Sequence, residues 1–107
     1  MNSETTTSMS HFQNKEIIKI AELFKVLGDP TRIKIISFFS KGEACVSELS
    51  QQLEISKSAT SHQLRVLKNY NIVNCHREGK MIIYNLNNFG MHELLSQTKI
   101  LVNRTYK

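Results

Sequence analysis

The stretch of sequence that decides the fold lies at residues 56–70 and reads SKSATSHQLRVLKNY. It opens on Ser56, whose hydroxyl can accept a hydrogen bond from an N–H group that the first turn of a helix leaves unpaired. Leu64 and Leu67 can then face a core, with Thr60 one turn earlier on the same side. The stretch therefore predicts a short helix with one apolar edge.

The other side of this predicted helix is polar and basic. Acidic residues are absent from positions 56–70, and the basic residues there are Lys57, Arg65 and Lys68. A wholly polar stripe at i, i+3, i+4 and i+7 consists of Ser58, Ser61, His62 and Arg65. A helix with a hydrogen-bonding edge and positive flanks suits the DNA major groove. On these residues alone, an ordinary solvated amphipathic helix is an equally good interpretation.

Three further helices are predicted before this one. Gly28 ends the first of them, since glycine takes the left-handed conformation that a helix terminus favours. Asp29 caps the second helix, and Pro30 begins it where a missing N–H costs nothing. Only residues 54–56 separate the third helix from the stretch that follows, so the pair predicts a helix-turn-helix. Apolar residues at the helical period place these helices at 15–27, 30 to about 40, and 46–53.

A β-hairpin is predicted after residue 71, where the apolar period changes from about 3.6 to 2. Residues 72–77 and 81–86 are rich in β-branched and aromatic side chains, as strands are. Glu78-Gly79 between them supplies a tight turn, with glycine for a positive φ. Arg77 and Lys80 flank this turn, which makes the predicted hairpin tip basic.

A last helix is predicted over residues 89–105, and it completes the order α-α-α-α-β-β-α. The fold class is therefore mainly α with a two-stranded β-hairpin. Residues 14–107 form a single domain, and the polar residues 1–13 form a flexible arm. The first and last helices carry more apolar surface than one small core needs, and a twofold interface would bury the excess.

Composition narrows the class of protein. The chain has 107 residues, a formal charge of +5 and a pI near 9.4, which favours nucleic acid or an acidic surface as partner. Cys45 and Cys75 stand far apart and form no disulfide framework, so the reducing cytoplasm is the expected compartment. No run of 18 apolar residues and no hydrophobic signal core is present, which argues against membrane insertion and secretion.

Four motifs follow one another along the chain: LGDPTR at 27–32, CVSEL at 45–49, SHQL at 61–64, and REGK at 77–80 followed by Ile83-Tyr84. Together they resemble the ArsR/SmtB family of transcriptional repressors, over residues 16–103. The resemblance implies a homodimeric winged helix-turn-helix whose first and last helices form the dimer interface. It also implies that a ligand or oxidant releases the repressor from its operator. Two recognition helices related by a twofold axis predict an inverted-repeat DNA operator.

The resemblance assigns DNA contacts to two parts of the chain. Its SHQL helix enters the major groove, so the residues that match family positions at DNA are Ser58, Ser61, His62 and Gln63. Short hydroxyls can approach phosphates or bases, and glutamine can pair with adenine. Basic side chains more plausibly bind phosphates, and those on the helix are Lys57, Arg65 and Lys68. Arg77 and Lys80 on the wing are candidates of the same kind.

The sensing residues depart from the family pattern. Members that bind zinc between their final helices carry Asp, His, His and a further His or Glu. The matching positions here are Asn88, Gly90, Leu101 and Arg104, so no zinc site is expected on the final helix.

A second family site uses thiolates at the third helix. Cys45 and Glu48 keep the spacing of that site, whereas Ser47 replaces its second cysteine, and the arm offers His11 as a partner. One thiolate with one carboxylate is a thin set for a thiophilic or transition metal, and no cofactor is assigned. Three alternatives remain: metal sensing at these residues, oxidation of Cys45 with or without Cys75, and regulation without a small-molecule inducer. Packing alone would also explain Cys75.

An enzyme is not expected. The four glycines form no phosphate-binding loop, and no paired carboxylates stand in an acid–base arrangement. His62 with Ser58 and Ser61 imitates a nucleophile–base pair, but the helix supplies neither an oxyanion hole nor an orienting acid. The remaining alternative to a DNA-binding repressor is a winged-helix module that binds protein.

Overall fold

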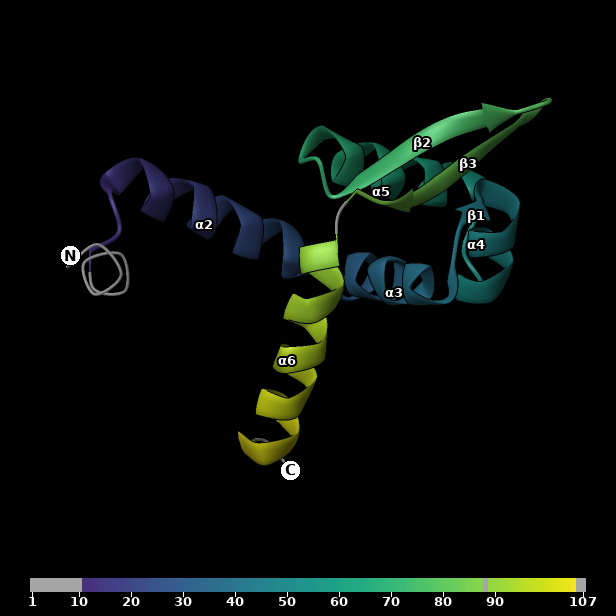
Figure 1. The fold of residues 1–107 in the computed structure, drawn as a ribbon. Coiled ribbons are helices and arrows are strands. Elements are labelled where there is room, and N and C mark those ends of the chain that lie inside the picture. The colour runs from purple at the N-terminus through teal and green to yellow at the C-terminus, as the bar shows by residue number, and fades with distance from the viewer. Residues whose placement is uncertain (1–10, 88, 106–107) are drawn as a thin grey trace.

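The computed structural model describes residues 11–87 and 89–105. Its elements follow the predicted order, with one short extra strand and one 3₁₀ turn (Figure 1). They are α2 (Asn14–Leu27), α3 (Pro30–Phe38), η1 (Phe39–Lys41), β1 (Ala44–Cys45), α4 (Val46–Leu53), α5 (Lys57–Asn69), β2 (Val73–Glu78), β3 (Met81–Leu86) and α6 (Phe89–Thr105). The mainly helical winged helix-turn-helix is confirmed. Residues 1–10 of the predicted arm lie outside the described residues, and so does Asn88.

The junction between α2 and α3 follows from its caps. Asp29 Oδ2 accepts a hydrogen bond from the Arg32 backbone N–H at 3.1 Å, and Pro30 occupies the first turn. Gly28 ends α2 as predicted, but its φ is −81°, so the prediction of a left-handed conformation was wrong. The chain passes directly from Gly28 into the extended Asp29 cap, and this path needs no left-handed residue.

The core lies between α3, α4, α5 and the inner face of the sheet. Its largest fully buried side chains are Ile35, Ile36, Leu49, Leu64, Leu67, Val73 and Thr60. Thr60 is the one polar member of that set, and its hydroxyl donates to the Ser56 carbonyl oxygen at 2.9 Å. The predicted apolar edge of α5, Thr60 included, is therefore the edge that packs inward.

The sheet is antiparallel in the order β1-β3-β2. In the hairpin Glu78 pairs with Met81, which leaves Gly79 and Lys80 as a two-residue loop. Gly79 has a φ of +63°, as a glycine at the first central position of a type II′ turn does. The turn thus lies one residue later than predicted, with Lys80 at its tip and Glu78 in the strand.

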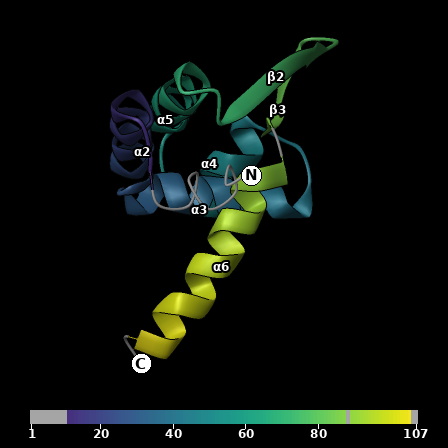
Figure 2. The same cartoon turned by 60° about the vertical axis from the view of Figure 1, so that its left-hand side comes forward.

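Helix α6 projects away from this body in both views, and α2 does so in Figure 1 (Figures 1 and 2). The radius of gyration is 16.4 Å, whereas a compact chain of this length would have about 13 Å. Large apolar side chains stay exposed on both helices: Ile17, Ile18, Ile20 and Phe24 on α2, and Ile100, Leu101 and Val102 on α6. Of the helices in the described residues, none is long and apolar enough to cross a membrane.

Candidate nucleic-acid interface and effector residues

A tight connection fixes α5 against α4. Glu54 takes the left-handed conformation with φ 57°, and the Ile55 N–H donates to the Ser50 carbonyl at 3.1 Å. Ser56 then caps α5, because its Oγ accepts from the Ala59 N–H at 3.0 Å. Each of these bonds lies within five residues, so the turn is set locally. The direction of α5 relative to α4 follows from it.

The outer face of α5 carries the predicted contact residues. Exposed side chains on it are Lys57, Ser58, His62, Arg65 and Lys68, and Ser61 is half-buried. The inner edge at Thr60, Leu64 and Leu67 is buried. A rigidly packed helix thus presents a face of hydroxyl, imidazole and cationic groups without a carboxylate, which is a surface that can meet phosphates and base edges.

Gln63 has a role that the sequence pattern did not reveal. Arg32 Nε donates to Gln63 Oε1 at 2.9 Å, and Arg32 Nη1 donates to the Val26 carbonyl at 3.1 Å. Glutamine needs its carbonyl oxygen to pair with adenine in two bonds, and here that oxygen is engaged. In this arrangement Gln63 holds α5 against α3 and the end of α2. Its predicted contact with DNA stays a prediction.

The hairpin places its cations where the predicted wing should have them. Arg77 on β2 and Lys80 at the tip are both exposed. A side-chain hydrogen bond joins the wing to α5: Lys68 Nζ donates to Cys75 Sγ at 3.2 Å. Cys75 is half-buried, so this contact lies at the junction of the wing and α5.

Cys45 and Glu48 form the N-terminal cap of α4. The Cys45 N–H donates to Glu48 Oε1 at 2.9 Å, and Cys45 Sγ accepts from the Glu48 N–H. The first of these bonds is the main reason why the pKa of Glu48 lies below its usual value. Cys45 itself is buried. The spacing that suggested an effector pair is therefore used as a capping box.

The other predicted sensing residues lie apart from Cys45. Strand β3 separates Cys45 from Cys75, which places their Cα atoms about 9–10 Å apart across the sheet. The two also point to opposite faces, so a direct disulfide would require the sheet to rearrange. His11 precedes α2, which begins on the side of the molecule away from β1 and α4 (Figure 1). One protomer thus does not bring His11 and Cys45 together.

A cluster that the sequence pattern missed lies on the outer face of the sheet. It consists of Glu43, His76 and Glu78, all exposed, and is called the wing cluster below. His76 Nε2 and Glu78 Oε2 lie 2.8 Å apart, and this hydrogen bond raises the pKa of His76. The i, i+2 spacing of His76 and Glu78 on a predicted strand could have indicated these two members of the cluster. No local signal relates Glu43 to them.

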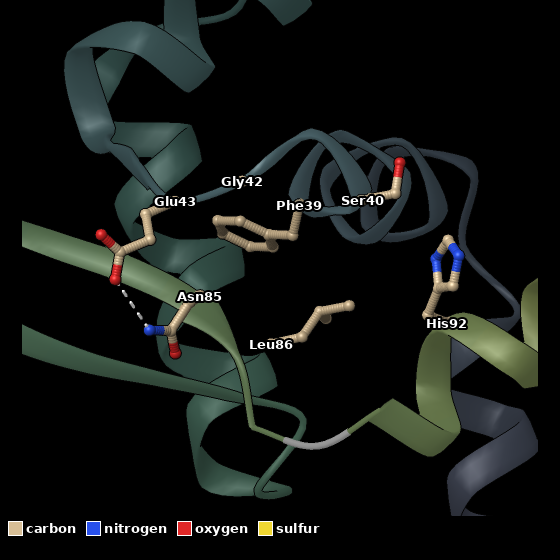
Figure 3. Close-up of a pocket in the computed structure, with 7 residues that line it drawn as sticks. All are labelled: Phe39, Ser40, Gly42, Glu43, Asn85, Leu86 and His92. Carbon is tan, nitrogen blue, oxygen red and sulfur yellow. Dashed lines mark hydrogen bonds between the residues drawn. The ribbon is translucent and has the colours of Figure 1, made fainter.

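Two hollows adjoin these elements. One, of about 310 Å³, lies between η1, the end of β3 and the start of α6; Asn85 and Glu43 join at its rim through a hydrogen bond of 3.2 Å (Figure 3). The other is a groove of about 500 Å³ between α3 and α6. Its lining is mixed: Ile33, Leu95 and Val102 are apolar, whereas Ser37 and Lys99 are polar.

Comparison with known sequences supports the resemblance. Residues 29–74 match the profile of the bacterial regulatory protein family arsR. The transcriptional repressor SdpR of Bacillus subtilis is 30% identical, over 77% of this chain and 91% of its own length. The chain belongs to the arsR family of bacterial regulatory proteins. This family comprises transcriptional regulators, not enzymes.

Two other relatives are longer than this chain. A transcriptional repressor SmtB homologue of Synechocystis is 38% identical over 64% of the chain and 52% of its own length. A cadmium resistance regulator CadC homologue of Staphylococcus aureus is also 38% identical, over 73% of the chain and 65% of its own length. The chain therefore spans between half and two thirds of these two proteins.

Solved structures agree with the arsR fold. Rv0081 of Mycobacterium tuberculosis is 30% identical and superposes with a TM-score of 0.79, over 87% of this chain and 93% of that one. The homodimeric winged helix-turn-helix domain of Mb0332 from Mycobacterium bovis has the same TM-score at 19% identity, over 92% and 93% of the two chains. At this identity, the similarity to Mb0332 concerns the fold alone.

Proposed function

We propose that this arsR-family chain is a homodimeric repressor that binds double-stranded DNA at an inverted repeat. The observation that carries the proposal is the outer face of α5. It is exposed, free of carboxylates and fixed to α4 by local bonds, with the cations Arg77 and Lys80 on the hairpin beside it. As a DNA-bound regulator with two free thiols, the protein would act in the cytoplasm.

The residues of this interface divide into two roles. Ser58, Ser61 and His62 reach base edges or nearby phosphates from α5. The cations that neutralise phosphates are Lys57, Arg65, Lys68, Arg77 and Lys80, with Gln63 positioned beside them by Arg32. Loss of a cation should weaken binding on all sequences, whereas loss of the first group should weaken binding to the operator most.

The second protomer is proposed to pair through α2 and α6. Exposed side chains such as Phe24, at 57%, and Leu101, at 61%, would otherwise stand in water on two helices that project from the body. A twofold interface that covers both helices would bury them and space two α5 helices along one DNA face.

Binding to duplex DNA tests the first part. Fluorescence anisotropy on a random duplex should show an affinity that falls steeply as salt rises, because phosphate contacts release counterions. Each phosphate contact removed, as in Lys80→Ala, should reduce the log–log salt slope by about 1. Ser61→Ala with His62→Ala should abolish operator binding and leave a dimer in analytical ultracentrifugation. An affinity that is flat with salt would favour the second candidate, a winged-helix module that binds protein.

Release by an effector is proposed to act through Cys45. Its Sγ caps α4, the first helix of the helix-turn-helix, so a change at sulfur would disturb the helix that orients α5. Hydrogen peroxide would convert the thiol to a sulfenic acid with loss of water, and a thiophilic metal would bind the thiolate, with Glu48 of the same chain and a His11 side chain supplied by the second protomer as predicted partners. The name of the CadC relative points to cadmium for that protein.

The variant Cys45→Ser gives a clean test of this release. Serine is a good N-cap, so the variant should keep the capping box and bind DNA as the parent does. In gel shifts titrated with peroxide, cadmium or zinc, the parent protein should be released from its DNA, whereas Cys45→Ser should stay bound. Cys75→Ser is the matched control, because it removes the other thiol. Release that survives the Cys45 change would exclude both forms of thiol sensing.

A further inference from the structure

The wing cluster brings together three ligand groups from two segments that are far apart in the sequence. Glu43 immediately precedes β1, and His76 and Glu78 lie on β2. One ligand atom of each lies within 4.8 Å of the other two. The cluster contains an imidazole as well as two carboxylates, so it is not only an acidic patch.

The sheet explains why these side chains meet. Cys45 and His76 both pair with Ile83 of β3, from opposite sides, and residues two apart on a strand share a face. His76 and Glu78 therefore share the outer face of the sheet with Glu43. Ile83 lies beneath them and is only 8% exposed.

The carboxylate of Glu43 is held in place. Asn85 Nδ2, from β3, donates to Glu43 Oε2 at 3.2 Å (Figure 3). A hydrogen bond from an outer residue to a ligating carboxylate is the usual support of a metal ligand. Asn85 is the partner that would orient this group.

We propose that Glu43, His76 and Glu78 bind one divalent transition-metal ion, for which Zn²⁺ is the reference. One imidazole nitrogen and two carboxylate oxygens are donors that such ions accept, and three protein ligands leave a fourth position for water. The charges also match, because two carboxylates and a neutral imidazole carry the −2 that a divalent cation balances. Mg²⁺ and Ca²⁺ prefer oxygen ligands throughout, so the imidazole disfavours them.

The geometry needs only small adjustments. Tetrahedral zinc with bonds of about 2.0–2.2 Å sets its donor atoms about 3.3–3.5 Å apart. His76 Nε2 and Glu78 Oε2, now at 2.8 Å, would move slightly apart, and the pairs that lie up to 4.8 Å apart would close. All three side chains are exposed, so rotations of their terminal bonds suffice and the core is not disturbed.

Such an ion would join two functional parts of the fold. Glu43 leads through β1 into the cap of α4, and β2 carries Arg77 on the wing. A bound ion would thus fix the wing to the start of the helix-turn-helix. This site is distinct from the Cys45 cap and from the final helix, and metal binding there does not depend on the proposed DNA binding.

Titration of the full-length chain with Zn²⁺ alone tests the site. Isothermal calorimetry of Cys45→Ser, which lacks the thiol proposed above as a metal ligand, should find one ion per chain at the wing cluster. Outer-shell changes at metal sites cost about 10–100-fold in affinity, so removing a ligand by His76→Gln or Glu78→Gln should cost at least about tenfold. Asn85→Ala should weaken binding within that range. Excess Mg²⁺ should not compete.

Matched controls come from elsewhere in the chain. His92→Gln and Glu93→Gln remove the same groups from α6, outside the cluster, and should bind Zn²⁺ as the parent does. A Cys45→Ser, Cys75→Ser double variant should also bind normally. Binding that persists in His76→Gln, or that disappears in the double cysteine variant, would overturn the proposal and leave His76 and Glu78 as an exposed ion pair only. Far-ultraviolet circular dichroism checks that each variant is folded.

Discussion

Helices α5 and α6 are both amphipathic, yet within the described residues only α5 buries its apolar edge along its length. Leu64 and Leu67 of α5 are fully buried against α3 and α4. On α6, Leu94 and Leu95 pack against the core, but Leu101 one to two turns later is 61% exposed. The first half of α6 thus belongs to this domain, and its second half extends beyond it.

The difference separates two tasks. A helix that reads DNA must present a polar face in a fixed orientation, so its apolar edge has to be buried in its own domain. A helix that joins two protomers must keep its apolar face available. Apolar surface on α5 should therefore govern the stability of the domain, whereas apolar surface at the end of α6 should govern assembly.

The largest expected effect is that of Leu64→Ala. Removing a fully buried leucine side chain loses its burial and leaves a cavity, which should lower the free energy of unfolding by about 2–5 kcal/mol. Urea denaturation at one fixed protein concentration measures this loss. The neighbour Arg65 is exposed, so Arg65→Ala should change stability by less than about 0.5 kcal/mol while it weakens DNA binding. Equal losses for the two variants would contradict the burial described for α5.

A smaller effect on the fold and a larger one on assembly are expected of Leu101→Glu. The side chain is exposed in one chain, so a carboxylate there should leave the circular dichroism spectrum unchanged. In a dimer that buries this face, the same charge would be desolvated without a partner, and sedimentation should then show monomers. Asn103→Glu places the charge on the same turn, about 160° around the helix. A dimer that survives Leu101→Glu but not Asn103→Glu would move the interface to the α3–α6 groove.

The elements that could be predicted from sequence are those whose signals are local. The stretch 56–70 carries its own cap, apolar period and polar stripe, and α5 begins and ends as expected. The hairpin turn was misplaced by one residue, because a Glu-Gly pair does not by itself distinguish which residue ends the strand. The two-residue strand β1 was missed for a related reason, since it exists only through pairing with β3.

The parts of the site that escaped prediction depend on contacts between distant segments. The hydrogen bond from Arg32, on another helix, to Gln63 has no local signal in the sequence. Glu43 is one acidic residue among nine in the sequence until the sheet brings it to His76 and Glu78. Cys45 and Glu48 show the reverse case, in which a spacing that suggested an effector site also satisfies a local helix cap.

The smallest effect expected is a pH dependence at the α4 cap, where Glu48→Gln should separate charge from hydrogen bonding. The pKa of Glu48 is lowered in the folded protein, so its ionised form stabilises the fold above the unfolded-state pKa, near 4.5. That contribution is lost as pH falls through the folded-state pKa. Glutamine can still accept the bond from the Cys45 N–H, but it does not titrate. Urea denaturation of both proteins from pH 7 down to pH 3 should therefore show the advantage of the parent shrinking below about pH 4.5. A difference that stays constant over this range would mean that Glu48 stabilises α4 through its hydrogen bond to the Cys45 N–H and not through its charge.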